Sequence, residues 1–160
     1  MVRTPEEPTV TETRELTVLT TDECQELLRS ESFGRLGVIV DHEPLIIPVN
    51  YALDRGVVVL RKKPGSTLLN AQHTNVSFEV DRIDATTRTG WSVLVRGLAE
   101  EVTPDHDAGI VGRTRATGLE PWAPGEDFRW VRIIPHGISG RRITAEEAPF
   151  DWHLGTAAYM

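Results

Sequence analysis

Three cations stand side by side in this sequence. Arg61, Lys62 and Lys63 follow the apolar run 57–60 and precede a Pro-Gly turn and a helix expected over 66–72. The start of a helix carries unpaired backbone N–H donors and about half a positive charge, so cations beside it are unfavourable unless an anion binds there. These residues therefore predict a phosphate site. Alternatively, the cations form a solvated strand edge that discourages pairing with another chain.

Other kinds of site find no support in the sequence. The Gly-x-Ser-x-Gly pattern of a serine nucleophile and the Gly-x-Gly-x-x-Gly pattern of a dinucleotide-binding domain are both absent. The five histidines form no close pair at the spacing of metal ligands, so we expect no metal. They are His42, His73, His106, His136 and His153.

The composition limits the classes of partner and the compartment. The chain has 160 residues, which suits one domain, and its 24 acidic and 17 basic residues give a net charge of −7. This charge opposes nonspecific attraction to nucleic acid or to an anionic membrane. The single cysteine cannot form an internal disulfide, and no signal peptide or run of about 20 apolar residues is visible. We therefore expect a cytoplasmic protein.

A short amphipathic helix is expected near the start of the chain. Thr20 and Glu23 have the spacing of a capping box, and Gly34 offers a stop signal. Cys24 lies on the same expected face as two leucines, which predicts a buried, unreactive thiol. A second helix is expected between Pro104 and Gly118.

Most of the remaining chain has the pattern of short β-strands separated by turns. Because helices do not alternate regularly with these strands, we expect a mainly β protein with short helices, built as a six- to seven-stranded antiparallel barrel. The barrel domain is expected over 16–143, between a flexible arm at 1–15 and a tail at 144–160. The expected strands are 35–40, 45–53, 57–60, 75–80, 91–102, 128–134 and 135–143.

Three stretches carry a resemblance to a known family. They read IPVNYALDRGVVVLRKKPGSTLLNA at 47–71, IDATTRTGWSVLVRGLAEEV at 83–102 and WVRIIPHGISGRRI at 130–143. In this order they resemble the FMN-binding split-barrel proteins of the pyridoxamine 5′-phosphate oxidase-like superfamily. The resemblance implies a split antiparallel β-barrel, FMN as cofactor and a homodimer whose two chains both contribute to the flavin site.

The resemblance also implies which residues hold the phosphate. In this family an Arg on the strand and a Ser that opens the next helix bind it, and these positions correspond to Arg61 and Ser66. A basic residue usually follows that Ser, and here the position holds Thr67. We expect Lys62 or Lys63 to supply the missing charge. Charge-assisted hydrogen bonds of this kind are about twice as strong as neutral ones.

Further positions are implied near the flavin ring. Pro48, Val49 and Asn50 occupy the stretch that runs alongside the ring in this family, although Pro48 would also suit an ordinary edge strand. Asn50 is expected to donate or accept a hydrogen bond at the polar edge of the ring.

Two later strands supply the remaining expected site residues. Trp91 and Ser92 begin a strand that reaches the flavin in these proteins, often across the dimer interface, and Trp91 would equally suit the core. Trp130 and Arg132 match a late strand near the cofactor, and strand alternation puts them on one face.

The resemblance implies an FMN-dependent oxidoreductase that acts on a small molecule and takes electrons from a donor such as NAD(P)H. A true pyridoxamine phosphate oxidase is not expected, because that enzyme's Arg-x-His pair is missing and the stretch 140–143 reads GRRI. The alternative from another class is a binder, carrier or sensor of flavin, of the deazaflavin F420 or of haem, without turnover. A third is a structural barrel with an empty site.

Overall fold

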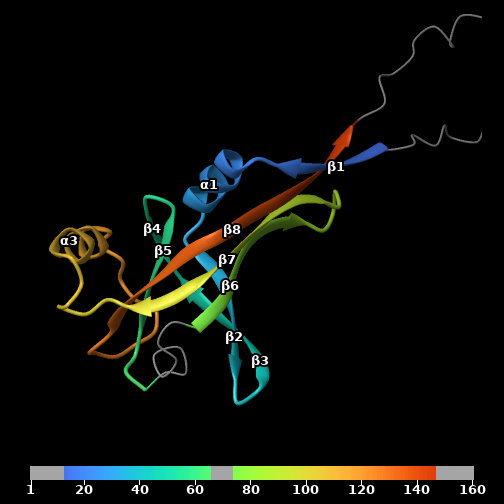
Figure 1. The fold of residues 1–160 in the computed structure, drawn as a ribbon. Helices are drawn as coiled ribbons and strands as arrows, with labels where there is room; N and C mark the ends of the chain where they lie inside the picture. Colours follow the sequence, from blue (N-terminus) through green and yellow to red (C-terminus); the bar gives the residue numbers. More distant parts are fainter. Residues whose placement is uncertain (1–12, 66–73, 147–160) are drawn as a thin grey trace, which may run out of the picture.

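The computed structural model describes residues 13–65 and 74–146, and these residues form one antiparallel sheet that curls on itself (Figure 1). The sheet has eight strands in this part of the chain, in the order β3-β2-β6-β7-β8-β5-β4, with β1 paired to β8. The expected helix over 66–72 lies outside the described residues. The elements are β1 (Thr13–Leu19), α1 (Thr21–Ser30), β2 (Phe33–Val40), β3 (Glu43–Asn50), β4 (Ala52–Asp54), β5 (Val57–Lys62), β6 (Thr74–Asp84), β7 (Thr89–Glu101), α3 (Ala108–Ala116) and β8 (Arg129–Glu146).

The inner face of the curl holds the hydrophobic core. Alternate residues of each strand point inward, so apolar side chains from β2, β5, β6, β7 and β8 meet inside the sheet. Together these side chains exclude water from one continuous cluster. The fully buried members include Leu36, Leu60, Phe78, Val93, Val95 and Ile133.

The barrel is split because its two end strands do not meet. β3 lies at one end of the strand order and the β4–β5 hairpin lies at the other. The chain crosses between them at Tyr51, whose buried hydroxyl donates a hydrogen bond to the carbonyl of Leu28 in α1. After Tyr51 the chain leaves its pairing with β2 and continues in β4, which pairs with β5.

Two tight turns fix the hairpins at either side of this split. Asp41 and His42 have φ values of 49° and 69° between β2 and β3, and Arg55 and Gly56 have values of 50° and 85° between β4 and β5. Two successive residues with positive φ match the twist of the flanking strands, which is typical of short hairpins.

Helix α1 begins with the expected capping box. The Thr20 hydroxyl accepts from the Glu23 backbone N–H at 3.3 Å, and the Glu23 carboxylate accepts from the Thr20 backbone N–H at 2.7 Å. Cys24 is fully buried, and this burial raises the pKa of its thiol. The expected stop at Gly34 is wrong, because the helix ends at Ser30 and Gly34 belongs to β2. A Cβ at Gly34 would come within 2.6 Å of the Phe78 ring.

The number of strands differs from the predicted six or seven for three reasons. The run 45–53 breaks at Tyr51 into β3 and β4, which pair with different neighbours. The runs 128–134 and 135–143 join into the single long strand β8. β1 was not expected, because its side chains are mostly exposed and its position depends on backbone pairing with β8. This pairing involves three residues of the expected arm and three of the expected tail.

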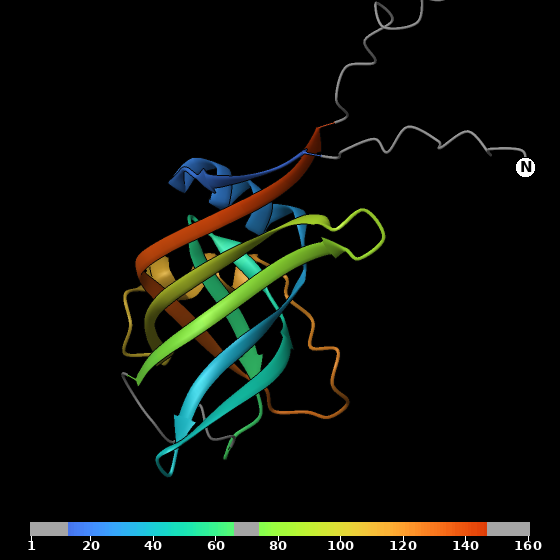
Figure 2. The same ribbon diagram turned by 90° about the vertical axis from the view of Figure 1, so that its right-hand side faces the viewer.

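The helices cover only part of the sheet. α1 packs against β8, β7 and β4, and α3 lies beside the β4–β5 end of the sheet (Figure 1). Within the described residues, no helix lies in front of the outer face of β2, β6 and β7 (Figure 2). Neither helix of the described part is long and apolar enough to span a membrane.

Candidate functional site

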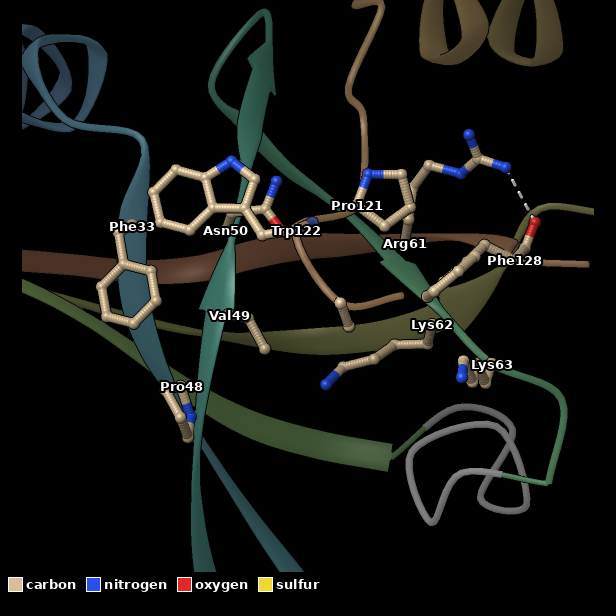
Figure 3. Close-up of a pocket in the computed structure, with 11 residues that line it drawn as sticks. Phe33, Pro48, Val49, Asn50, Arg61, Lys62, Lys63, Pro121, Trp122 and Phe128 are labelled. Carbon is tan, nitrogen blue, oxygen red and sulfur yellow. Dashed lines mark hydrogen bonds between the residues drawn. The ribbon is translucent and has the colours of Figure 1, made fainter. Parts of the chain in front are cut away.

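A cleft of about 260 Å³ lies at the opening of the barrel between β3 and β5 (Figure 3). One side is formed by Pro48, Val49 and Asn50 of β3, and the other by the cations at 61–63. Phe33, Phe128 and the loop residues 121–123 complete the lining. The structure thus brings six of the expected site residues together, although they come from two stretches that do not pair with each other.

Lys62 points into this cleft. Strand alternation places it on the same side of β5 as the buried residues Val58 and Leu60, and its side chain extends toward Val49 (Figure 3). Burial lowers the pKa of the Lys62 ammonium, since a charge is less stable where water is excluded. Among the described residues that line the cleft, none carries a carboxylate to balance this charge.

Arg61 points to the other side of β5. Its guanidinium donates to the Phe128 carbonyl at 3.0 Å and lies 4.4 Å from the centroid of the Trp130 ring. Within the described residues, its Nε is buried and has no hydrogen-bond partner. Arg61 is therefore held in place by Trp130 and Phe128, and its buried Nε is a donor that these contacts do not use.

Lys63 is the most exposed of the three cations. Its ammonium lies 5.6 Å from the centroid of the Phe128 ring, at the mouth of the cleft. A cation over an aromatic ring at an exposed site contributes about 0.5–1 kcal/mol. Of the two lysines, Lys62 is therefore the less exposed to water, and its positive charge is the less compensated by neighbouring groups.

Asn50 holds the loop that forms the third side of the cleft. Its side-chain Nδ2 donates to the Glu120 carbonyl at 2.8 Å, and its Oδ1 accepts from the Trp122 backbone N–H at 3.3 Å. Sequence reasoning expected these groups to face a flavin ring. In this structure they bind protein backbone instead, and they place Trp122 against Phe33.

Phe33, Trp122 and Phe128 were not expected in the site. Trp122 lies in a segment with loop composition, and Phe33 stands where the sequence indicated the end of a helix. Phe33 and Trp122 stack with ring centroids 5.5 Å apart and planes 10° from parallel. The sequence did contain one signal for Trp122, because this residue stands between two prolines at 121–124. A large aromatic side chain in a loop that prolines make rigid has no hydrophobic core to enter.

The other expected site residues lie outside this cleft. Trp130 lies beneath Arg61, and Arg132 donates to Asp54 at 2.7 Å and to Thr114 at 2.6 Å. As expected, Trp130 and Arg132 share one face of β8, but Arg132 is buried under α3.

Trp91 and Ser92 lie farther along the sheet, on β7. Trp91 packs partly against the core, as the alternative interpretation had it, and Ser92 lies on the outer face in register with Asp81 and Arg141. Neither residue is among the lining residues of the cleft in the described part of the chain. Ser66 and Thr67, the remaining expected residues, lie outside the described part of the chain.

Comparison with known proteins identifies the family. The family model described as pyridoxamine 5′-phosphate oxidase matches residues 20–142. The chain belongs to this family. A protein of Mycobacterium tuberculosis is 33% identical over 139 residues, which are 83% of this chain and 89% of the relative.

Solved structures support both the family and the fold. An FAD-binding protein from Mycobacterium smegmatis is 36% identical, with a TM-score of 0.69 over 79% of this chain and 97% of that one. An FAD-binding protein from Mesorhizobium loti is 26% identical, with a TM-score of 0.64 over 82% of this chain and 99% of that one. The resemblance inferred from the sequence and the expected split barrel of the pyridoxamine 5′-phosphate oxidase family are therefore confirmed.

Proposed function

We propose that this chain binds a flavin nucleotide in the cleft between β3 and β5 and acts as a flavin-dependent oxidoreductase on a small molecule. The observation that carries the proposal is the Lys62 ammonium, which enters a cleft without a carboxylate among its described lining residues. A phosphate would balance this charge and restore the pKa that burial lowers. Within the described part of the chain, the buried Nε of Arg61 is a further donor without a hydrogen-bond partner.

The nucleotide of the proposal is FMN or FAD. The resemblance implies FMN, whereas the related structures from Mycobacterium smegmatis and Mesorhizobium loti are FAD-binding proteins. Both ligands contain the same riboflavin 5′-phosphate unit, and the cations on β5 suit that unit in either case. The identity of the copurifying ligand shows whether the bound nucleotide carries a second phosphate, as FAD does.

A homodimer is part of the proposal. Ligand sites usually measure about 300–1,000 Å³, so the cleft of one chain, about 260 Å³, would enclose only part of a flavin nucleotide. The outer side of the sheet exposes apolar side chains on neighbouring strands: Ile83 on β6, Ile143 on β8 and Leu16 on β1 lie in one row, with Gly90 of β7 between the two isoleucines. A second copy of the chain packed on this face would bury them and enlarge the site.

The flavin, when bound, would supply the hydride-transfer chemistry, and the chain would bind it, orient it and limit access of water. NAD(P)H is the proposed electron donor and a small molecule the proposed substrate. The cleft lining includes no histidine, cysteine or carboxylate within the described residues. This feature favours a second candidate, a flavin carrier or sensor without turnover. A cytoplasmic location remains part of the proposal, because the lone Cys24 cannot form an internal disulfide.

The absorption spectrum and mass of the ligand that copurifies with the protein test the proposal. FMN or FAD would support it, and F420, haem or no ligand after supplying flavin would contradict it. Bleaching of the bound flavin by NADH or NADPH, followed by reoxidation with a small-molecule acceptor, would distinguish the oxidoreductase from the carrier.

A further inference from the structure

Phe33 and Trp122 form an aromatic pair at the rim of the cleft, outside the hydrophobic core. The two rings are nearly parallel, with planes 10° apart and centroids separated by 5.5 Å. Trp122 is 64% exposed and Phe33 is 41% exposed. Large aromatic side chains gain most when they are buried, so a stacked but exposed pair leaves apolar surface available for another ring.

The loop that carries Trp122 is held from two directions. Asn50 binds the backbone of both Glu120 and Trp122, and Leu119 is buried at the start of the loop. Pro121 fixes its own backbone torsion immediately before the tryptophan. Trp122 is thus held in one position before any ligand arrives, which reduces the ordering entropy that binding would otherwise cost.

The two sides of the cleft offer different chemistry. The β5 side presents Lys62 and Lys63, and the rim on the β3 side presents the Phe33 and Trp122 rings. A ligand that matches both sides carries an anionic group at one end and a flat aromatic system at the other. Flavin nucleotides have this shape, and the oxidised isoalloxazine ring is electron-poor, which suits stacking on an electron-rich indole.

We infer that Trp122, supported by Phe33, stacks on the isoalloxazine ring of the flavin whose phosphate lies at Lys62. This inference rests on the proposed function and assigns a ring-binding role to two residues that the sequence did not indicate. Adenine is the other ring that a flavin ligand can bring. The assignment to isoalloxazine predicts that FMN, which has no adenine, depends on Trp122 as strongly as FAD does.

A pair of substitutions separates the indole ring from mere apolar bulk. Trp122→Leu removes the ring, and Trp122→Phe keeps a ring of smaller area. Removing a stacking ring costs about tenfold or more in affinity, so Trp122→Leu should raise the dissociation constants of FMN and FAD by about that factor. Trp122→Phe should lie within about threefold of the parent protein. ADP, titrated by calorimetry, should bind both variants as it binds the parent.

Flavin fluorescence provides an independent readout. An indole stacked on isoalloxazine quenches its emission by electron transfer, so FMN bound to the parent should be dimmer than FMN bound to Trp122→Phe at saturation. Equal emission from both complexes would contradict the stacked arrangement. Thermal unfolding of each variant without ligand provides the folding control, and little change is expected because Trp122 is mostly exposed.

The remaining outcomes separate this inference from the proposed function. If FMN binds Trp122→Leu as tightly as the parent, the ring assignment is wrong, although the flavin site stands as long as Lys62→Met weakens FMN. If Trp122→Leu weakens FAD and ADP but not FMN, the ring is adenine and the assignment is overturned. If Trp122→Leu changes only the mass of the protein in solution, Trp122 lies at a contact between chains. If the parent binds no flavin, the proposed function fails as well.

Discussion

Arg132 and Asp54 form a nearly buried ion pair, with 2.7 Å between the guanidinium and the carboxylate. They are 5% and 8% exposed. The same guanidinium nitrogen donates to the Thr114 hydroxyl, so the pair ties helix α3 to strands β4 and β8. The chain after α3 leads directly to the loop that carries Trp122. This polar contact therefore positions the third side of the cleft from a distance.

Asp54→Asn should destabilise the fold by about 3–5 kcal/mol, because it leaves the buried Arg132 charge without a counter-charge. Urea denaturation measures this loss. Asp84→Asn is a suitable control, because Asp84 is exposed and its carboxylate accepts from the backbone N–H groups of Thr86 and Thr87 in the adjacent turn. A loss below about 1 kcal/mol for Asp54→Asn would contradict the role given to the pair.

The Asp54 pair also predicts a dependence of stability on pH. Burial by itself would raise the pKa of Asp54, but the hydrogen bond and charge of Arg132, together with Arg113, lower it below its ordinary value. The contribution of the pair is therefore complete above the unfolded-state pKa of about 3.9 and is lost as the pH falls through the lower folded-state value. Urea titrations between pH 6 and pH 3 should show a smaller decrease for Asp54→Asn than for the parent.

Lys62→Met should stabilise the protein without ligand and weaken FMN binding. The lowered pKa of Lys62 means that its charge is less favourable in the folded than in the unfolded chain, so removing that charge at neutral pH favours folding. The same charge is the proposed partner of the phosphate. Thermal unfolding and FMN titration measure the two effects, and Lys63→Met, at an exposed cation, is the matched control. A decrease in stability with unchanged FMN affinity would contradict both parts.

Asn50→Ala should weaken flavin binding although Asn50 contributes no bond to the flavin in this account. It removes both bonds to the backbone of the 120–122 loop, and each contributes about 0.5–1.5 kcal/mol. Trp122 would then lose its fixed position. Increased quenching of tryptophan fluorescence by acrylamide, together with a several-fold weaker FMN affinity, is the expected result. Weaker FMN affinity with unchanged quenching would instead indicate that Asn50 contacts the flavin ring, as the sequence suggested.

The sequence predicted the fold class because the signals for it are local. The capping box at Thr20, the turn residues after Val40 and Asp54, and the alternating strands each depend on neighbours within a few positions. The β3 and β5 sides of the cleft could also be named, through the family resemblance. The strand β1 could not be predicted, since its seven mostly exposed residues take their structure from pairing with the distant strand β8.

The part of the site that the sequence did not predict depends on contacts between distant segments. Phe33 and Trp122 are 89 positions apart, and the hydrogen bonds from Asn50 help to bring the loop to β2. The opposite directions of Arg61 and Lys62 follow from strand alternation. Without knowing which face of β5 is buried, the sequence could not decide which of these cations enters the cleft.

The dimer predicts a mass in solution of twice 17.8 kDa. Ile46 of β3 is 75% exposed and lines a second hollow together with Ile39 and Leu45. Ile46→Arg should shift the protein to monomer at micromolar concentration, because a charge would be buried without a partner. Ala108→Glu, at the exposed start of α3, is the control and should leave the mass unchanged. Light scattering that gives one chain for the parent would contradict the dimer.

Arg61→Ala should weaken FMN far more than riboflavin. Removing one charged partner of a partly desolvated pair costs about 2–5 kcal/mol, which is roughly 30-fold or more in affinity, and riboflavin has no phosphate to lose. Arg61 also holds the Phe128 carbonyl and lies over Trp130, so some general loosening of the site is expected. That loosening would affect both ligands equally, and the difference between them isolates the phosphate contact.

Arg61→Lys refines this test, since it keeps the charge but loses the planar stack on Trp130 and the Nε donor. If charge alone binds the phosphate, Arg61→Lys should recover most of the FMN affinity that Arg61→Ala loses. If binding needs the Nε donor, Arg61→Lys should recover little of the FMN affinity. Fluorescence titration of both variants with FMN and riboflavin gives the comparison. Equal losses for the two ligands in Arg61→Ala would mean that Arg61 supports the Phe128 loop and that the phosphate depends on Lys62.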